Sequence, residues 1–554
     1  MKRNPLFMSV LASLFLAGCS QEEIVPNGED NGTGEANTNY MVVNLMPSDV
    51  TGTRATNVYE DGTGDENKVT SVRFYFFNGV GGAVNVKLQG TSYVNYYDWT
   101  SGDGDQSNDT NDGDDIESKL KATIVINTQK GDGIPQRIAA VLNPTGLGNK
   151  SMSLTELKDV VADYVASGLT TKGKFVMFNA VYASGGAQVS TVAITDKNLC
   201  KTEIEAINNP VTIYVERSVA KVRVTLDTQM DYDADKGLAL KDKDGNLLSV
   251  DGQQVYLKLE GWGLTAETSK GRLIKKINPG WAGTWWNGTH RSFWAINAMD
   301  ATNLYHDYSS IGTSFGADNA LYTNENAQLT DTDGTEGKAK ERTKVILKGR
   351  LCKADGASFT IVRHLGVRFA DDEDLSKLKE SILNQLLAGG YNYYYAIGNG
   401  RKQIGTDDLQ IVVATQQANE DSQNNCYVYA QLTDAAKAKT WYNSSDESAQ
   451  PITDAAVEIN GKLADKEIVD RALVWKDGMT YYFYEIKHLE SETGVVRNHI
   501  YATNVTKIAG LGTPVYNPEE IIYPEIPDPN NHFIAAQINI LSWRVVDNSY
   551  ELEW

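Results

Sequence analysis

The sequence predicts an all-β protein with a few short helices, and three observations support this fold class. Residues that favour strands are abundant, with 28 Tyr and 10 Trp, whereas Leu-rich helical runs are few. Short runs of alternating apolar and polar residues recur along the chain, as in VTIYVERSVAKVRVTL at residues 211–226. Because 554 residues with 41% hydrophobic content exceed what one core can hold, we expect two or three domains.

Residues 1–19 resemble a bacterial lipoprotein signal peptide. Lys2 and Arg3 precede an apolar run at residues 6–16, which is too short to cross a membrane, and Leu-Ala-Gly then leads to Cys19. Cys19 stands at the position of the acylated first residue of such a lipoprotein. A plain secretory signal peptide with a chance cysteine is the weaker alternative.

Residues 20–54 are expected to form a propeptide that contains one strand. A polar, Gly-rich leader is followed by YMVVNLM at residues 40–46, which reads as a short strand. The next loop holds a single basic residue, Arg54, among small and polar residues, and such exposed loops are where proteases cut. Cleavage between Arg54 and Ala55 suits an Arg-specific or trypsin-like protease, but any long chain has exposed arginines.

The first folded domain is expected at residues 55–226. Its expected strands span residues 69–77, 123–127, 137–144, 175–182, 188–194 and 211–226. Ser153 and Glu156 form a capping box that begins a helix. The apolar face of this helix is expected to hold Leu157, Val160, Val161, Tyr164 and Val165. In the last strand the alternation is offset at Arg217 and Ser218, which indicates a bulge or a strand pair that switches sheets.

The second folded domain is expected at residues 227–513. Its expected strands span residues 255–264, 343–351, 359–369, 391–397, 409–415, 473–475 and 480–486. An amphipathic helix at residues 372–388 is closed by Gly389 and Gly390. A Trp-dense region contains Trp281, Trp285, Trp286 and Trp294. We interpret these aromatic side chains as core, with a sugar-stacking surface as the alternative.

Residues 514–554 are expected to be a Pro-rich tether followed by two strands. Five prolines between residues 514 and 529 predict an extended run that holds the following strands away from the body. Seven apolar residues in the two strands are the expected donor residues: Ile538, Ile540, Leu541, Val545, Tyr550, Leu552 and Trp554. An unpaired apolar strand is an aggregation hazard, so the tail either pairs with a neighbouring molecule or folds back as an edge hairpin of its own domain. Composition alone does not separate these two possibilities.

Several kinds of chemistry find no support in the sequence. A net charge of −21 argues against nucleic acid binding. The six His are scattered without metal or triad spacing, and three Cys beyond Cys19 do not indicate a disulfide framework. The acidic insertion at residues 101–115 lacks the EF-hand spacing, so we interpret it as a solvated loop rather than a Ca²⁺ site. We therefore expect no enzyme activity, cofactor or metal.

Taken together, these features resemble the Bacteroidales fimbrillins, the subunits of type V pili, and among them the Mfa-type shaft subunits of minor fimbriae. The resemblance rests on the lipobox at Cys19, the sequence Thr-Arg-Ala at residues 53–55 and the strand at residues 211–224. It also rests on Arg-Asn-His-Ile-Tyr at residues 497–501, followed by Gly-Leu-Gly and the Pro-rich tail. The insertions at residues 101–115 and 304–337 match poorly.

The resemblance implies two tandem transthyretin-like β-sandwich domains with a C-terminal donor-strand appendage. It also implies a precursor anchored to the outer membrane by its lipid, cleavage after Arg54 by a gingipain-type protease, and a mature subunit in a cell-surface fimbrium. Strand exchange would join identical subunits head to tail and join them to accessory, tip and anchor fimbrillins. The fibre would bind host or bacterial surface ligands and support adhesion and biofilm formation.

Two other functions remain open from the sequence. A tip or accessory fimbrial adhesin would accept a strand without having to donate one, and the long tail ending at Trp554 argues for a shaft subunit instead. A surface glycan-binding lipoprotein would use the Trp-dense region at residues 281–294.

Overall fold

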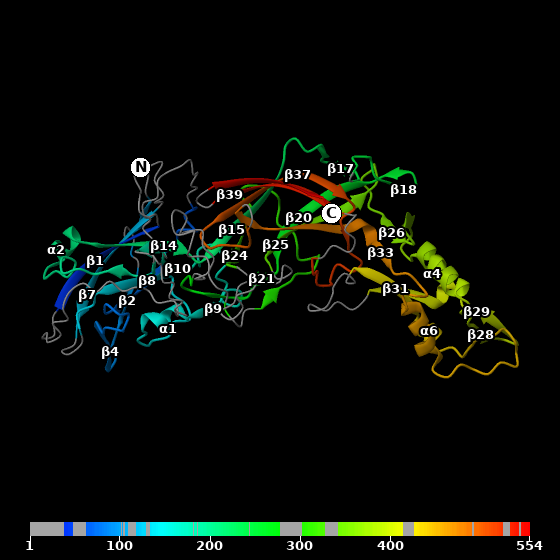
Figure 1. Cartoon of the computed structure of the whole chain (residues 1–554), viewed down its shortest axis with the longest axis horizontal. Coiled ribbons are helices and arrows are strands. Elements are labelled where there is room, and N and C mark those ends of the chain that lie inside the picture. The colour runs from blue at the N-terminus through cyan, green and yellow to red at the C-terminus, as the bar shows by residue number, and fades with distance from the viewer. Residues whose placement is uncertain are drawn as a thin grey trace, which may run out of the picture.

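Our computed structural model describes sixteen segments of the chain, which are residues 38–47, 62–100, 102, 106–108, 118–128, 133–180, 182–184, 187–242, 244–276, 298, 302–326, 342–413, 426–489, 492–524, 532–541 and 545–553. Within these segments the regular secondary structure is mostly strand, which confirms the predicted all-β class. The described helices are α1 (Leu154–Lys158), α2 (Glu203–Asn208), α4 (Ser376–Ala388), α5 (Asp434–Lys437) and α6 (Ala455–Ala464). The molecule is elongated, with β1 and β7 towards one end and α4 and α6 towards the other (Figure 1).

The first sandwich is built from one long sheet that curls around a core. In order across the sheet, its strands are β5 (Tyr96–Thr100), β2 (Ser71–Phe77), β8 (Arg137–Leu142), β10 (Met177–Asn179), β14 (Val211–Arg217), β1 (Thr38–Pro47), β7 (Ser118–Asn127) and β6 (Gln106–Asn108), with β13 (Val192–Ala193) paired to β8. The Asn127 N–H donates to Val86 O at 2.8 Å, and the Val86 N–H donates to Val94 O at 2.9 Å. These bonds bring β7 next to the segment that joins β2 to β5, so the sheet closes on itself.

Residues of both faces of this sheet are buried. One face encloses an inner core to which β2 contributes Phe74 and Phe76 and β14 contributes Ile213. The other face carries Tyr75 and Phe77, and it is covered by α1 and the chain around it. Burial on both faces explains why the strand sequences contain runs such as FYFF rather than strict alternation.

The helix predicted after Ser153 is shorter than expected. The capping box between Ser153 and Glu156 is present, but α1 ends at Lys158. Residues Val161–Asp163 form strand β9, which pairs with β22 (Lys270–Arg272), a strand that follows β20 of the second sandwich along the chain. The expected helical face from Val160 to Val165 is therefore wrong, because β-branched residues here gain a strand partner that only the tertiary fold provides.

The second sandwich packs two sheets face to face. One sheet runs in the order β24 (Ala320–Asn324), β15 (Val219–Leu226), β37 (Ile500–Gly510), β39 (His532–Leu541) and β40 (Val545–Glu553). The other runs in the order β16 (Tyr232–Asp233), β17 (Gly237–Ala239), β20 (Tyr256–Thr265), β25 (Lys344–Cys352), β34 (Met479–Glu485) and β38 (Thr513–Pro514). Val224, Tyr501 and Val505 from the first sheet meet Trp262 and Leu347 from the second in one core.

The predicted long strand at residues 211–226 is two strands in different sheets. β14 ends at Arg217 in the first sandwich, and β15 begins at Val219 in the second. The pattern offset therefore marks a switch between sheets, and residues 219–226 belong to the second sandwich rather than to a first domain that extends to Leu226. Apolar alternation is equally good on both sides of the switch, which is why the sequence placed the boundary later.

A separate α/β module extends the second half of the molecule. Its sheet runs in the order β27 (Val367–Asp371), β26 (Thr360–His364), β33 (Ala472–Trp475), β31 (Tyr427–Leu432) and β30 (Leu409–Val413), beside a small sheet of β29 (Gly400–Gln403), β28 (Tyr394–Ile397) and β32 (Trp441–Tyr442). α4 and α6 pack on this module, and α4 buries Leu378, Ile382 and Leu386 as the amphipathic pattern predicted. The second domain is thus a sandwich with an added α/β module that has its own core.

Five short ladders complete the described strands. They are β3 (Lys87–Gln89) with β4 (Ser92–Val94), β11 (Tyr182–Ser184) with β12 (Ala187–Val189), β18 (Ser249–Val250) with β19 (Gln253–Gln254), β21 (Glu267–Thr268) with β23 (Asn303–Leu304), and β35 (Lys487–Leu489) with β36 (Glu492–Thr493), besides the β9–β22 pair.

Candidate assembly site

Strand β1 lies in the interior of the first sheet, between β7 and β14. It runs antiparallel to β7 and parallel to β14. Val43 stands opposite Ala122 on one side and Val211 on the other, and Met41 is fully buried in the inner core. The strand expected at residues 40–46 is therefore present, and it completes both the ladder and the core of the first sandwich. We call the position between β7 and β14 the acceptor slot.

The covalent link from β1 to the rest of the chain passes through residues 48–61, which lie outside the described residues. Arg54 and Ala55 belong to this link, and Cys19 also lies outside the described residues. If the link were cut, only non-covalent contacts would hold β1. Loss of the strand would leave β7 and β14 each with an unpaired edge and would uncover inner-core residues such as Ile124 and Ile213.

The C-terminal strands are paired within the same molecule. β39 runs antiparallel to β37, and β40 runs antiparallel to β39 along the outer edge (Figure 1). By register, Ile538, Ile540 and Leu541 stand opposite Thr503, Tyr501 and Ile500. Val545, Tyr550 and Leu552 stand opposite Leu541, Ala536 and Ile534, and Trp554 lies outside the described residues. In the full-length chain the tail thus forms the edge hairpin that the sequence left as one of two possibilities.

The first part of the Pro-rich run lies against the body rather than away from it. Val515 and Ile522 are buried, and the Val515 N–H donates to Met479 O at 3.2 Å. The Ser309 N–H donates to Pro518 O at 3.1 Å, and the Ile522 N–H donates to His306 O at 2.9 Å. Proline fixes an extended backbone here, but the apolar side chains between the prolines dock on the second sandwich. The expectation of a free tether is therefore wrong for residues 514–524.

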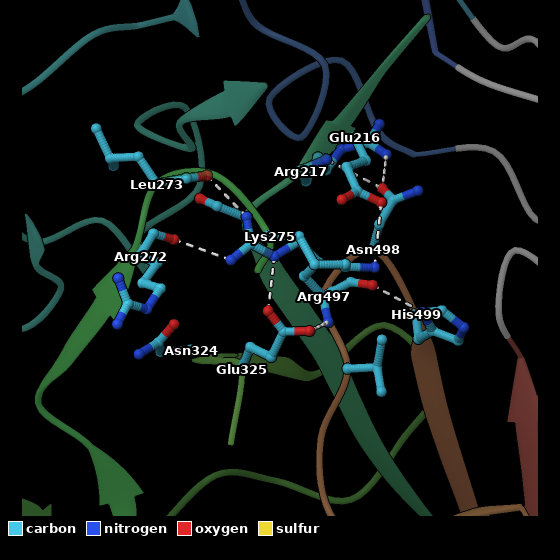
Figure 2. A network of polar contacts seen from close by, with 12 residues as sticks. Glu216, Arg217, Arg272, Leu273, Lys275, Asn324, Glu325, Arg497, Asn498 and His499 are labelled. Carbon is cyan, nitrogen blue, oxygen red and sulfur yellow. Dashed lines mark hydrogen bonds and ion pairs between the residues drawn. The ribbon is translucent and has the colours of Figure 1, made fainter. Parts of the chain in front are cut away.

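A buried network of charged and polar residues joins the two sandwiches (Figure 2). At its centre, Arg497 is 1% exposed and its Nε lies 2.7 Å from Glu325 Oε2. Its Nη1 and Nη2 donate to Leu273 O and Arg272 O at 2.8 and 2.9 Å. Burial lowers the pKa of Arg497, but Glu325, Tyr164 and Glu216 together outweigh this effect, so the pKa lies above its usual value and the side chain stays charged.

Asn498 connects this network to the end of β14. Its Oδ1 accepts from the Arg217 N–H and from Arg217 Nη1, both at 3.3 Å, while the Asn498 N–H donates to Val219 O at 2.7 Å. Asn498 adopts a left-handed backbone with φ of 57°. Next to it, Lys275 Nζ lies 3.5 Å from Glu216 Oε2, and both side chains are buried (Figure 2). The dipeptide Arg497-Asn498 thus contacts the last residue of one wall of the acceptor slot.

Glu66 fixes the chain that follows the predicted cleavage site. This residue is 1% exposed, and its Oε1 lies 2.9 Å from Lys221 Nζ and accepts a hydrogen bond from the Tyr322 hydroxyl. Arg217 Nε donates to the Glu66 carbonyl at 3.0 Å. Burial raises the pKa of the Glu66 carboxyl, but hydrogen bonds from Tyr322, Lys221 and Thr63 outweigh burial, so the pKa lies below its usual value. The sequence singled out Arg497 and Asn498 only as parts of a matching stretch and Arg217 only as the site of a pattern offset, and Glu66 and Glu325 were missed.

The Trp-dense region at residues 281–294 and most of the acidic insertion at residues 101–115 lie outside the described residues. Among the residues that the structure describes, His, Cys, Asp and Glu side chains form no group of three that could hold a metal ion. The described helices include none that is both long and apolar enough to span a membrane.

Comparison with models of protein families gives two matches. The family "Major fimbrial subunit protein (FimA)" matches residues 40–217, and the family "Major fimbrial subunit protein type IV, Fimbrillin, C-terminal" matches residues 474–549. The first match begins within β1 and ends at the last residue of β14, so it covers the acceptor slot. The second covers Arg497-Asn498, β37, β39 and part of β40. No curated protein sequence matches the chain.

Several solved structures align with the chain at low similarity. The tip fimbrial protein Mfa3 from Porphyromonas gingivalis, with a C-terminal truncation, is 12% identical, and the alignment covers 92% of this chain and 100% of that one with a TM-score of 0.30. A putative cell adhesion protein from Bacteroides eggerthii is 10% identical, with 92% and 98% coverage and a TM-score of 0.33. Another from Parabacteroides distasonis is 11% identical, with 90% and 96% coverage and a TM-score of 0.34.

Proposed function

This chain belongs to the Bacteroidales fimbrillin family of fimbrial structural subunits, and we propose that it forms the shaft of a surface pilus by strand exchange. The proposed pathway begins with export as a lipoprotein acylated at Cys19. Cleavage after Arg54 by an Arg-specific protease follows, and the C-terminal strands then enter the acceptor slot of a neighbouring subunit. The observation that carries this proposal is the interior position of β1, which a single cut in residues 48–61 would disconnect from the sheet that it completes.

Covalent tethering explains why the uncut chain would not polymerise. A tethered β1 has an effective concentration on the order of millimolar or more at its slot, which a strand from another molecule does not reach. Cleavage removes this advantage, because a released β1 is diluted into the medium together with its lipid. The emptied slot then offers two backbone edges and an apolar floor, which a strand can fill by β-augmentation.

The C-terminal strands have the length and composition to fill the slot. β1 is 10 residues long, β39 is also 10 and β40 is 9. Burial of the seven apolar donor residues, from Ile538 to Trp554, gives roughly 10–20 kcal/mol as an upper bound, at ~1.5–3 kcal/mol each before ordering costs. Half of this value would make dissociation very slow. Because such a contact joins the front of one molecule to the rear of another, it builds a filament rather than a closed ring.

The paired tail in the full-length chain fits an inactive precursor. In this state β1 fills the slot, and β39 and β40 cover the edge of β37 in the same molecule. Both partners of the exchange are therefore occupied internally before cleavage. An unpaired apolar edge is an aggregation hazard during export, and internal pairing protects both edges.

An Arg54→Ala variant tests the maturation step. We expect it to stay full length with β1 in its slot and to form no filaments, whereas filaments of the wild-type protein should start at Ala55 by N-terminal sequencing. Arg54→Lys is the charge-matched control, because it blocks an Arg-specific protease but not a trypsin-like one. Filaments whose subunits begin far from Ala55 would overturn this assignment.

Deletion of residues 535–554 tests strand donation separately. We expect ladders of multimers on gels of unboiled samples to disappear, while cleavage after Arg54 continues. If the ladders persist, the tail is not the donor and the shaft assignment is wrong, which leaves a tip or accessory role.

A further inference from the structure

We propose that Asn498, supported by Arg497, positions the β14 wall of the acceptor slot while the slot is empty. This inference rests on the proposed strand exchange, since the slot is empty only between departure of β1 and arrival of a donor strand. In that interval β14 keeps β10 on one side but loses β1 on the other. A strand that has lost one neighbour frays unless other contacts hold its ends.

The first support for the wall is the direct continuation of β14 into the second sandwich. The chain passes from Arg217 through Ser218, which is fully buried, into β15. The Ser218 N–H and Oγ both donate to Val176 O, at 2.9 and 2.8 Å. β15 is itself held between β24 and β37. The C-terminal end of the wall is therefore anchored between β24 and β37, two strands that the proposed exchange leaves in place.

The second support comes from hydrogen bonds that hold Arg217, the last residue of β14. Asn498 accepts from both its backbone N–H and its guanidinium, and the guanidinium also donates to the Glu66 carbonyl and to Asn67 Oδ1. Glu66 and Asn67 follow the proposed cut, so they stay with the subunit after maturation. These four residues lie outside β1, and their contacts persist when β1 departs.

The third support holds Asn498 itself. Arg497 binds Glu325, which follows β24, and the carbonyls of Arg272 and Leu273 at the end of β22. β22 pairs with β9 of the first sandwich, and the Leu273 N–H donates to Val160 O at 3.1 Å. Arg497 therefore fixes the dipeptide relative to both sandwiches (Figure 2). The planar guanidinium, with its five donors, suits this multiple bonding.

Fixing one wall in advance should speed the capture of a donor strand. When β14 is already in place, binding costs only the conformational entropy of the incoming strand. When β14 is frayed, binding must also supply the free energy that orders β14. Asn498 acts on the slot through Arg217, and Arg497 acts through Asn498, so both are positioning residues.

Asn498→Gly is the test variant. Glycine accepts the left-handed φ of Asn498 without strain but lacks the oxygen that binds Arg217. Leu365→Gly is the matched control, because Leu365 also has a left-handed backbone, with φ of 52°, and lies 51% exposed in the turn between β26 and β27, far from the slot along the chain. Arg497→Lys is a second variant for the case that Asn498→Gly does not fold. It keeps the positive charge but cannot donate hydrogen bonds to Glu325, Leu273 and Arg272 in the geometry of the planar guanidinium.

The experiment uses the full-length protein, cut with an Arg-specific protease and mixed with a labelled synthetic peptide of residues 532–554. Hydrogen exchange of residues 211–217 and the rate of peptide capture are measured before and after the cut. We expect Asn498→Gly to match the wild type before the cut, because β1 then holds β14. After the cut, we expect exchange to rise and capture to slow by about tenfold each, while Leu365→Gly matches the wild type.

The outcomes separate this inference from the function on which it rests. If cut wild-type protein captures no peptide, strand exchange into this slot is wrong. If the wild type captures peptide and Asn498→Gly does so equally fast or faster, with unchanged exchange at residues 211–217, the positioning role is wrong.

Discussion

Glu66 shows how one buried carboxylate can tie the segment before β2 to the second sandwich. Its partners Lys221 and Tyr322 lie on β15 and β24, and its own segment leads into β2. Hydrogen bonds to the ionised carboxyl outweigh burial and hold its pKa below the usual value. A carboxyl with a lowered folded-state pKa stabilises the fold above its unfolded-state pKa and loses this contribution as the pH falls through the folded-state pKa.

We therefore predict that Glu66→Gln reduces the loss of folding stability that occurs when the pH falls into the acid range. At pH 7 the variant should be less stable than the wild type, because a neutral amide replaces the carboxylate that pairs with Lys221. The difference should shrink as the pH falls below the ordinary carboxyl value of 4.5 and through the lowered one. Urea denaturation at several pH values measures this, and a stability difference that stays constant from pH 7 to pH 3 would contradict it.

The residues of the junction could not have been found from sequence spacing. Arg217 and Asn498 are 281 residues apart, and Arg497 and Glu325 are 172 apart. Charged residues usually lie at the surface, so Arg217, where the apolar alternation is offset next to Ser218, was the one available signal. That signal indicated an irregularity in the strand, but it did not indicate which distant residues contact Arg217. Cys19 and Arg54, by contrast, belong to local motifs that can be read without the fold.

At the scale of elements, β1 should stabilise the precursor but not the fibre. We predict that Met41→Ala lowers the stability of the uncut chain by about 2–5 kcal/mol, because it removes a buried side chain from the inner core. The stability of assembled filaments should not change, because the proposed exchange removes β1 from each subunit. Urea denaturation of the uncut monomer and dissociation of filaments on heated gels give the two values.

Ile213→Ala is the control for this prediction. Ile213 is fully buried in the same core but lies on β14, which stays in the filament. It should destabilise both the uncut chain and the fibre. If Met41→Ala weakens the filament as strongly as Ile213→Ala does, then β1 remains in its slot and is not replaced.

Elements with local signals were predicted well, and elements that depend on distant partners were not. The helix with Leu378, Ile382 and Leu386 on one face was correctly assigned because its apolar period is helical over three turns. The strand at residues 40–46 follows from a short, mostly apolar run, and the tail strands follow from alternation. The helix after Ser153 was overextended because β22, from more than a hundred residues away, recruits Val161–Asp163 into a strand. For the same reason the sequence did not decide where the tail docks.

At the scale of the molecule, the two sandwiches share apolar core as well as polar contacts. Val219, Leu273 and Ile274 come from the part of the chain that follows β14, yet they pack with Leu157 and Phe178 on the face of the first sheet that α1 covers. Together with the β9–β22 ladder and the Arg497 network, this contact makes the pair a single body rather than two domains on a hinge. A fibre of such subunits would bend between molecules rather than within them.

We predict that the uncut protein unfolds its two sandwiches in one cooperative transition. Neither sandwich keeps its buried residues covered when the other unfolds, so calorimetry should give a single main peak for both. Leu273→Ala should split or broaden this peak, because Leu273 is fully buried where the two sandwiches meet.

Leu240→Ala is the matched control, since Leu240 is equally buried but lies in the core of the second sandwich alone. It should lower the transition temperature without splitting the peak. Two separate transitions in the wild-type protein would mean that the halves fold independently and that the junction does not couple them.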